Sequence, residues 1–116
     1  MNKQEVIQAL NRILDPDLKD RSIVEMGFVG EEDVEVSEEE IHVSYTVGGP
    51  LCPYSAAVGI IIHHTLSEIF KKRIKVRMKA GHYQQDIVNQ ILGNEGRFAE
   101  WFEKIKSQNL LTAWIR

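Results

Sequence analysis

The segment from Ile41 to Ala80 constrains the fold of this chain more than any other part of the sequence. Apolar residues occupy every second position over 41–47 and again over 74–80, and they recur with helical spacing over 58–69. Period-two alternation is typical of strands with one buried face, and helical spacing is typical of an amphipathic helix. Strands joined by a crossover helix run parallel. The sequence therefore predicts a parallel strand pair with a helix packed against it.

One further strand and three further helices are expected around this unit. Alternation over 34–36 predicts a strand before it, and helical spacing predicts short helices near 83–91 and 98–105. A first helix should end at Asp15-Pro16, because proline disfavours helical geometry in the residue before it. The predicted fold class is therefore α+β. We expect a small two-layer domain with a three-stranded mixed sheet and helices on one face, in the order helix, strand, strand, helix, strand, helix, helix.

The length and composition fit one small globular domain with a short addition. The chain has 116 residues, of which 43% are hydrophobic and 27% are charged, as in ordinary globular proteins. We expect a domain over residues 1–92 and a C-terminal helical extension over 93–116, because Gly93 and Gly96 break the helical pattern. The net charge of -3 argues against nucleic acid as a partner.

No part of the sequence has the pattern of a targeting or membrane segment. The apolar stretches are far shorter than the roughly 20 residues that span a bilayer. The N-terminal residues also lack the charged-then-apolar pattern of a signal peptide. A single cysteine rules out an internal disulfide, which suits a reducing compartment. We therefore expect a cytoplasmic protein that does not act at membranes.

Cys52 is the residue best suited to carry chemistry. It follows a strand and lies where the next helix is predicted to begin, near Cys52-Pro53. The unpaired N–H groups at a helix start favour thiolate over thiol. Gly48 and Gly49 would let a metal or a partner's backbone approach closely. The alternative is a buried, inert cysteine that serves as a small hydrophobe. Because conventional iron–sulfur clusters commonly need four thiolates, one chain cannot enclose such a cluster alone.

His82 is a second candidate, since it follows the other parallel strand. The carboxyl ends of parallel strands meet at one edge of a sheet, which brings His82 and Cys52 to the same side. His82 is a base, a metal ligand or an exposed loop residue, and the sequence leaves these alternatives open. His63 and His64 lie eleven and twelve residues beyond Cys52, or roughly 16–18 Å along a helix. They are too distant to share a metal with Cys52 and are interpreted as ordinary helix residues.

A row of basic residues occupies the polar face of the last predicted strand. The row consists of Arg73, Lys75, Arg77 and Lys79. It is interpreted as a solvated sheet face, balanced by the acids Asp33 and Glu35 on another strand. A docking surface for an acidic partner is the alternative interpretation.

Three sequence blocks are similar to motifs of one known family. The first is Ile13–Asp17, similar to I-x-D-P-E/D, and the second is Ser22–Val29, similar to S-I-V-E-L-G-L-V. The third is Tyr45–Val47 leading to Cys52-Pro53, similar to a strand-to-helix turn of the type L-T-x-T followed by C-P. Together the blocks resemble the PaaD/SufT-type metal–sulfur cluster assembly proteins, a family related to the C-terminal domain of NifU-like scaffolds. The resemblance covers roughly residues 4–92.

The resemblance implies a non-enzymatic role in the maturation of iron–sulfur proteins, with Cys52 at the position of the family's signature cysteine. The implied partners are iron–sulfur apoproteins and the cluster assembly machinery. The implied cargo is transient iron or an iron–sulfur cluster, shared between two chains or with a client. A homodimer would double the number of thiols. The sequence identifies neither the clients nor the cluster type.

Other residues are expected to support this site or to extend it. The supporting candidates are Asp15, Glu25, Thr46, Gly49, Pro53 and His82. Asp15 and Glu25 match acids of the family motifs and either contact the site or hold the loops that carry them. Trp101 and Trp114 lie in the C-terminal extension, where they cover the core or a dimer interface or, if exposed, bind a client.

Two functions from other classes remain open. In the first, the chain is a small thiol enzyme with Cys52 as nucleophile and His82 as base, which requires the two side chains to lie within hydrogen-bond reach. In the second, the chain is an interaction adaptor whose cysteine is incidental, since small α+β folds do not dictate function. The adaptor hypothesis predicts that Cys52→Ser changes nothing.

Overall fold

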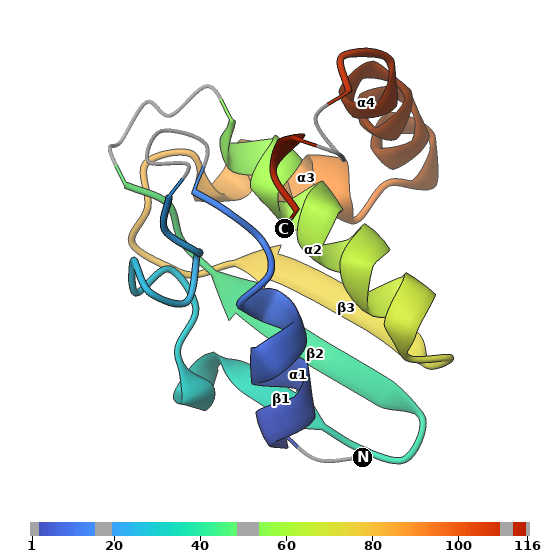
Figure 1. Cartoon of the computed structure of the whole chain (residues 1–116). Helices are drawn as coiled ribbons and strands as arrows, with labels where there is room; N and C mark the ends of the chain where they lie inside the picture. The colour runs from blue at the N-terminus through green and yellow to red at the C-terminus, as the bar shows by residue number, and fades with distance from the viewer. Residues whose placement is uncertain (1–2, 16–19, 49–53, 110–112, 116) are drawn as a thin grey trace.

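The structural elements follow one another in the predicted order. The computed structural model describes residues 3–15, 20–48, 54–109 and 113–115. The elements within these ranges are α1 (Lys3–Leu10), η1 (Glu31–Asp33), β1 (Val34–Val36), β2 (Glu40–Tyr45), α2 (Ser55–Ile69), β3 (Arg73–Met78), α3 (Gln85–Leu92) and α4 (Glu95–Ser107). Apart from the short 3-10 helix η1, this is the expected series of helices and strands. The predicted α+β class is confirmed (Figure 1).

The three strands form one mixed sheet in the order β1-β2-β3. β1 pairs with β2 antiparallel, and β2 pairs with β3 parallel, with Ile41 opposite Ile74 and Tyr45 opposite Met78. This confirms the parallel pair that the alternating segments predict. Because β2 and β3 run in the same direction, the loops that follow them leave the sheet at the same edge (Figure 1).

The inner face of the sheet and α2 supply most of the core. Ile41 and Tyr45 on β2 and Met78 on β3 are 0% exposed. α2 contacts α1, β3, α3 and α4, so it is buried on nearly every side and is apolar on nearly every side. The helices lie on one side of the sheet, as predicted (Figure 1). In the described part of the chain, no helix combines the length and apolar character needed to cross a membrane.

The end of α1 differs from the prediction. The helix ends at Leu10, and Ile13 and Leu14 instead form isolated β-bridges with Ile115 and Ser22. The backbone N–H of Leu14 donates to the Trp114 carbonyl oxygen at 2.7 Å. Both residues are apolar at helical spacing, but their backbone groups pair with two other segments of the chain instead of continuing the helix. The prediction of a helix up to Asp15-Pro16 was therefore wrong.

The C-terminal segment packs against the rest of the molecule. His63 and His64 on α2 meet the rings of Phe98 and Phe102 on α4, at centroid distances of 4.9 and 5.3 Å. Trp114 is 3% exposed and joins the core. Of the two tryptophans, Trp114 therefore covers the core, as one of the interpretations predicted. The division of the chain between residues 92 and 93 stays a prediction.

Candidate functional site

The turn between β2 and α2 carries the principal candidate. Cys52, Gly49 and Pro53 lie outside the described residues, but the residues that flank them are placed. The backbone N–H of Thr46 donates to the carbonyl oxygen of Phe28 at 3.0 Å. Thr46 therefore ties the end of β2 to the block Ser22–Val29. Two of the three blocks that resemble the family motifs thus lie against each other.

A buried tyrosine fixes the start of α2. The Tyr45 hydroxyl donates to the Ser55 carbonyl oxygen at 2.6 Å, which supplies the partner that a buried hydroxyl needs. Gly59 faces this ring so closely that a Cβ atom there would lie 2.5 Å from Tyr45 Oη. On the outer side, the Tyr54 ring meets Trp114 edge-on at a centroid distance of 4.9 Å. The first turn of α2 is therefore held from both sides.

Asp15 is buried at the start of a neighbouring loop. It is 4% exposed, and its backbone N–H donates to the Arg21 carbonyl oxygen at 2.8 Å. A carboxylate with so little contact with water needs partners or a cation nearby. Asp15 directly precedes residues 16–19, which are outside the described ranges. Its placement fits either anchoring of this loop or a site role.

Glu25 forms a structural pair with Ser22, and the spacing of the two residues in the sequence indicates this pair. Glu25 Oε1 accepts from the backbone N–H of Ser22, and the backbone N–H of Glu25 donates to Ser22 Oγ, both at 3.0 Å. This reciprocal pair is the capping-box pattern of a serine followed three residues later by glutamate. Ser22 Oγ in turn donates to Asn11 Oδ1. Glu25 thus stabilises the turn of the second block, and the Ser-x-x-Glu spacing was a readable signal for that role.

His82 lies half-buried in the loop after β3. Its Nδ1 accepts from the backbone N–H of Gln84 at 3.0 Å, so neutral His82 carries its proton on Nε2. The preceding residue, Gly81, has a φ of +99°, which glycine adopts without strain. The side-chain oxygen of Gln84 is buried and has no hydrogen-bond partner in the described part of the chain. The nitrogen that a base would use is thus already engaged, and the Cys52–His82 pair stays a prediction.

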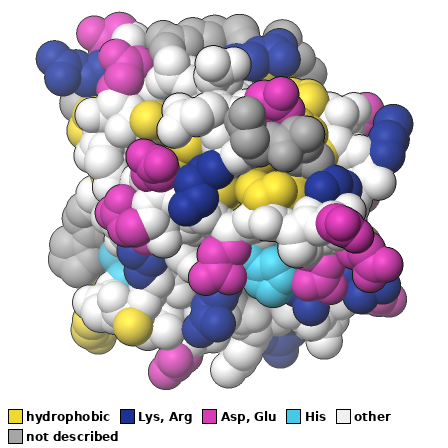
Figure 2. Space-filling view, turned by 90° about the horizontal axis from the view of Figure 1, so that it is seen from below, with side chains coloured by type: hydrophobic (Ala, Val, Ile, Leu, Met, Phe, Trp, Pro, Cys, Tyr) yellow, Lys and Arg dark blue, Asp and Glu magenta, His cyan; other side chains and the backbone are white. Residues whose placement is uncertain are grey.

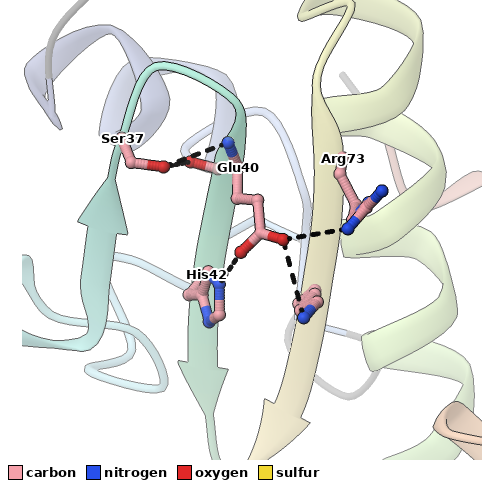
Figure 3. A network of polar contacts seen from close by, with 5 residues as sticks. Ser37, Glu40, His42 and Arg73 are labelled. Atoms are coloured by element: carbon pink, nitrogen blue, oxygen red, sulfur yellow. Dashed lines mark hydrogen bonds and ion pairs between the residues drawn. The ribbon is translucent and has the colours of Figure 1, made fainter.

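The outer face of the sheet forms an ion-pair network around Glu40. Its carboxylate contacts His42 at 2.7 Å, Arg73 at 3.3 Å and Lys75 at 3.6 Å (Figure 3). The hydrogen bond from His42 lowers the pKa of Glu40, and Lys75, His42 and Arg73 lower it further, against a smaller opposing effect of burial. The sequence interpretation missed Glu40, because only the register that sets it opposite Arg73 reveals the pairing.

The other two residues of the basic row differ in their ion pairing. Lys79 Nζ pairs with Asp33 Oδ2 at 2.6 Å, one of the two acids expected to balance the row. Arg77 has no ion-pair partner within the described residues. Seen from below, the molecule presents acidic and basic side chains side by side (Figure 2). This mixing is typical of a solvated face.

The described residues do not form a metal site by themselves. Over residues 3–15, 20–48, 54–109 and 113–115, no group of three His, Cys, Asp or Glu side chains is placed to hold a metal ion. The chain's one cysteine is outside these ranges. Four protein thiolates for a conventional cluster are therefore not available from this chain.

The comparisons with known proteins bear on the first half of the chain. A sequence model of a family described as iron–sulfur cluster assembly protein matches residues 3–62. The matched segment contains α1, β1, β2 and the residues Asp15, Glu25 and Cys52. No curated protein matches the chain in a sequence search. Because the family match covers more than half of the residues, the chain belongs to the family of iron–sulfur cluster assembly proteins.

Proposed function

We propose that this protein is a maturation factor that passes iron or an iron–sulfur cluster to client apoproteins through Cys52. The observation that carries the proposal is the family match over 3–62, which includes the only cysteine of the chain. Reduced thiols persist in the cytoplasm, and we place the activity there. The partners are iron–sulfur apoproteins and the assembly machinery that loads them.

The packing on both sides of Cys52 supports a positioned thiol. The bonds Thr46–Phe28 and Tyr45–Ser55 fix the residues before and after the turn. A thiol close to the first turn of α2 would lie near unpaired N–H groups, which stabilise its thiolate form.

The chemistry in this proposal is ligand exchange. The Cys52 thiol loses its proton to solvent, and its sulfur forms a bond to iron as the bond from a previous ligand breaks. The client's thiolate then displaces Cys52 in the same way, so no electrons are transferred and the cysteine is regenerated. One thiolate occupies only one of the coordination positions of a cluster. The remaining ligands come from the client, from a second copy of the chain or from small-molecule thiols.

The proposal is tested by anaerobic transfer of a cluster to a purified apo-ferredoxin, followed by its visible absorption. Wild type should accelerate transfer, and Cys52→Ser should abolish the acceleration. The matched control is Cys52→Ser combined with Ser107→Cys, which keeps one thiol per chain but places it at the exposed end of α4. This control should also be inactive. Equal activity of all three proteins would contradict the role of Cys52.

Capture from cell extract under anaerobic conditions separates this proposal from the adaptor hypothesis. Iron–sulfur proteins recovered with wild type and lost with Cys52→Ser would support ligand exchange. The same partners with both baits would favour an adaptor whose cysteine is incidental. A small thiol enzyme would show neither pattern and would instead require His82 for turnover of a substrate.

A further inference from the structure

The outer edge of β3 is the starting point of this inference. β3 is the last strand of the sheet and pairs with β2 on one side only. The backbone N–H groups of Arg73 and Lys79 donate toward β2, to Glu39 and Tyr45, at 3.0 and 2.7 Å. In a parallel ladder, alternate residues of a strand bond to the same neighbour. The backbone groups of Ile74, Val76 and Met78 therefore point outward.

Side chains occupy both ends of this edge and leave its middle open. At Met78, the backbone N–H donates to Asn89 Oδ1 at 2.8 Å, and Asn89 Nδ2 donates to the Met78 carbonyl oxygen at 3.3 Å. One asparagine thus makes the two bonds that a further strand would make. At Ile74, the His63 ring lies beside the backbone, and both residues line the same groove. Within the described residues, the backbone of Val76 has no partner on the outer edge.

A groove runs beside this open position. It has a volume of about 680 Å³ and lies between β3 and the turn from α3 to α4. Its apolar lining comes from Ile74, Val76, Leu92 and Phe98. A second hollow of about 390 Å³ shares Asn89 and Gly93 with it and extends toward Arg97. Apolar hollows of several hundred Å³ with a few polar groups are typical of ligand sites.

We propose that this groove binds an extended peptide segment of a partner protein, which pairs with the backbone of Val76 and carries alternating apolar and acidic side chains. Peptides commonly add to an exposed sheet edge in this way, with the main chain giving affinity and alternate side chains giving specificity. The apolar side chains would enter the groove. The acidic side chains would lie on the opposite face of the added strand, beside Lys75 and Arg77.

The charges around the groove favour an acidic segment. Lys75 and Arg77 line the groove, and Arg97 lines the adjoining hollow. Glu95 is the acid among the lining residues. Arg77 has no ion-pair partner in the described part of the chain, so it is available to a carboxylate. This is the docking interpretation of the basic row, now located at one edge of the sheet.

A second copy of this chain is a poorer occupant. Edge-to-edge pairing of two β3 strands would bring the row of Arg73, Lys75 and Arg77 beside its own copy. Like charges opposite each other across a strand pair are destabilising. α3 contacts β3 and residues of α4 line the same groove, so two copies of both helices would have to fit around one junction. An extended peptide meets neither obstacle.

The groove does not use Cys52 or the residues that flank it. A failure of the cluster-transfer proposal therefore leaves this inference standing, and the reverse also holds. Cys52→Ser should bind the same peptide with unchanged affinity.

The test uses a synthetic capped peptide of about seven residues in which valine and aspartate alternate. Two control peptides are compared with it. One has the same composition without alternation, and the other has lysine in place of aspartate. Binding to the full chain is followed by ¹⁵N–¹H NMR and calorimetry. The alternating acidic peptide should bind best, shift the Val76 amide and slow its hydrogen exchange. The amide of Thr46, which follows β2 and bonds to Phe28, should not shift.

Two variants make the test specific. Arg77→Glu, an exposed substitution, should weaken the acidic peptide by about two- to fivefold and strengthen the lysine peptide. Val76→Pro removes the outward N–H from an edge strand, where proline is tolerated, and should weaken binding by about threefold or more. Equal binding of all three peptides, or shifts confined to other surfaces, would overturn the proposal. A dimer that forms through β3 at NMR concentrations would also overturn it.

Discussion

The turn from β2 to α2 and the outer edge of β3 satisfy their polar groups in different ways. Beside the turn, Tyr45 and Thr46 make hydrogen bonds within the chain, and Glu25 does the same in the neighbouring block Ser22–Val29. At the edge, Asn89 and His63 engage the two ends and leave Val76 open. The family match covers the first region and stops before the second. The difference shows how one small domain can hold the residues that flank one loop by hydrogen bonds and leave a backbone position open at another edge.

The largest expected effect comes from Trp114→Ala, which tests how firmly the turn is held. Trp114 is 3% exposed and meets Tyr54 edge-on. Loss of a buried aromatic ring should lower the free energy of unfolding by about 3–5 kcal/mol. This loss is measured by urea unfolding followed by circular dichroism. Trp101→Ala, at a half-buried position, should lower the free energy of unfolding by less. Equal losses for the two variants would mean that Trp114 stabilises the fold no more than the half-buried Trp101 does.

Gly59→Ala tests the same region from its inner side. The added methyl group would meet the Tyr45 ring, with the nearest atom at 2.5 Å. Overpacking should lower the free energy of unfolding by about 1–3 kcal/mol, although alanine is a better helix former than glycine. The control is Gly96→Ala in α4, where the nearest neighbour of a Cβ atom is a side-chain oxygen at 3.4 Å. That variant should be neutral or more stable, and a similar loss at both sites would refute the close contact.

Asn89→Ala tests the edge of β3. It removes both bonds to the Met78 backbone and should lower the free energy of unfolding by about 1 kcal/mol. The more specific readout is local: the Met78 amide should exchange with solvent faster, and the Thr46 amide should not. Gln90→Ala, an exposed neighbour, is the control. Unchanged hydrogen exchange at Met78 would show that Asn89 does not protect the Met78 backbone as a neighbouring strand would.

The smallest expected effect is a pH dependence at His63. Burial lowers the pKa of His63 below 6.5, and the nearby His64 lowers it further, while a hydrogen bond to the Ile74 backbone raises it. The folded state then binds fewer protons than the unfolded state between the lowered pKa and 6.5, so stability rises with pH in that window. The contribution is complete above pH 6.5 and is lost as the pH falls through the lowered pKa.

Urea midpoints at pH 7.5 and pH 5.5 measure this dependence. Wild type should lose more stability on acidification than His63→Gln does. His64→Gln is the matched variant, and it should retain most of the dependence because burial of His63 is the larger cause. Identical pH responses of wild type and His63→Gln would exclude His63 as the source.

The fold could be predicted where a local pattern and the tertiary structure agree. The alternation of β2 and β3 and the apolar spacing of α2 predict a parallel pair with a crossover helix, which the structure has. At Ile13 and Leu14 the same kind of reasoning failed. Their spacing is helical, but Ile115 and Ser22 pair with them as β-bridges. Ile115 is so distant in sequence that it leaves no local signal, and the pairing of Leu14 with Ser22 depends on the loop that joins them.

The candidate site was predictable to a lesser degree. The cysteine and the family blocks could be read directly from the sequence, and the Ser22–Glu25 capping box could have been read as well. The contacts of Glu40 and Asn89 depend on strand register and on where α3 docks. Those follow from packing of the whole chain and not from any single segment.

The bridge between Ile13 and Ile115 also bears on the order of events during biosynthesis. About 100 residues separate the two partners, and contacts of such long sequence separation form late and slow the folding reaction. Ile13 therefore cannot reach its final pairing before Ile115 has been synthesised. The segment that the family model matches would thus depend, for its final structure, on a residue that lies far beyond it in the sequence.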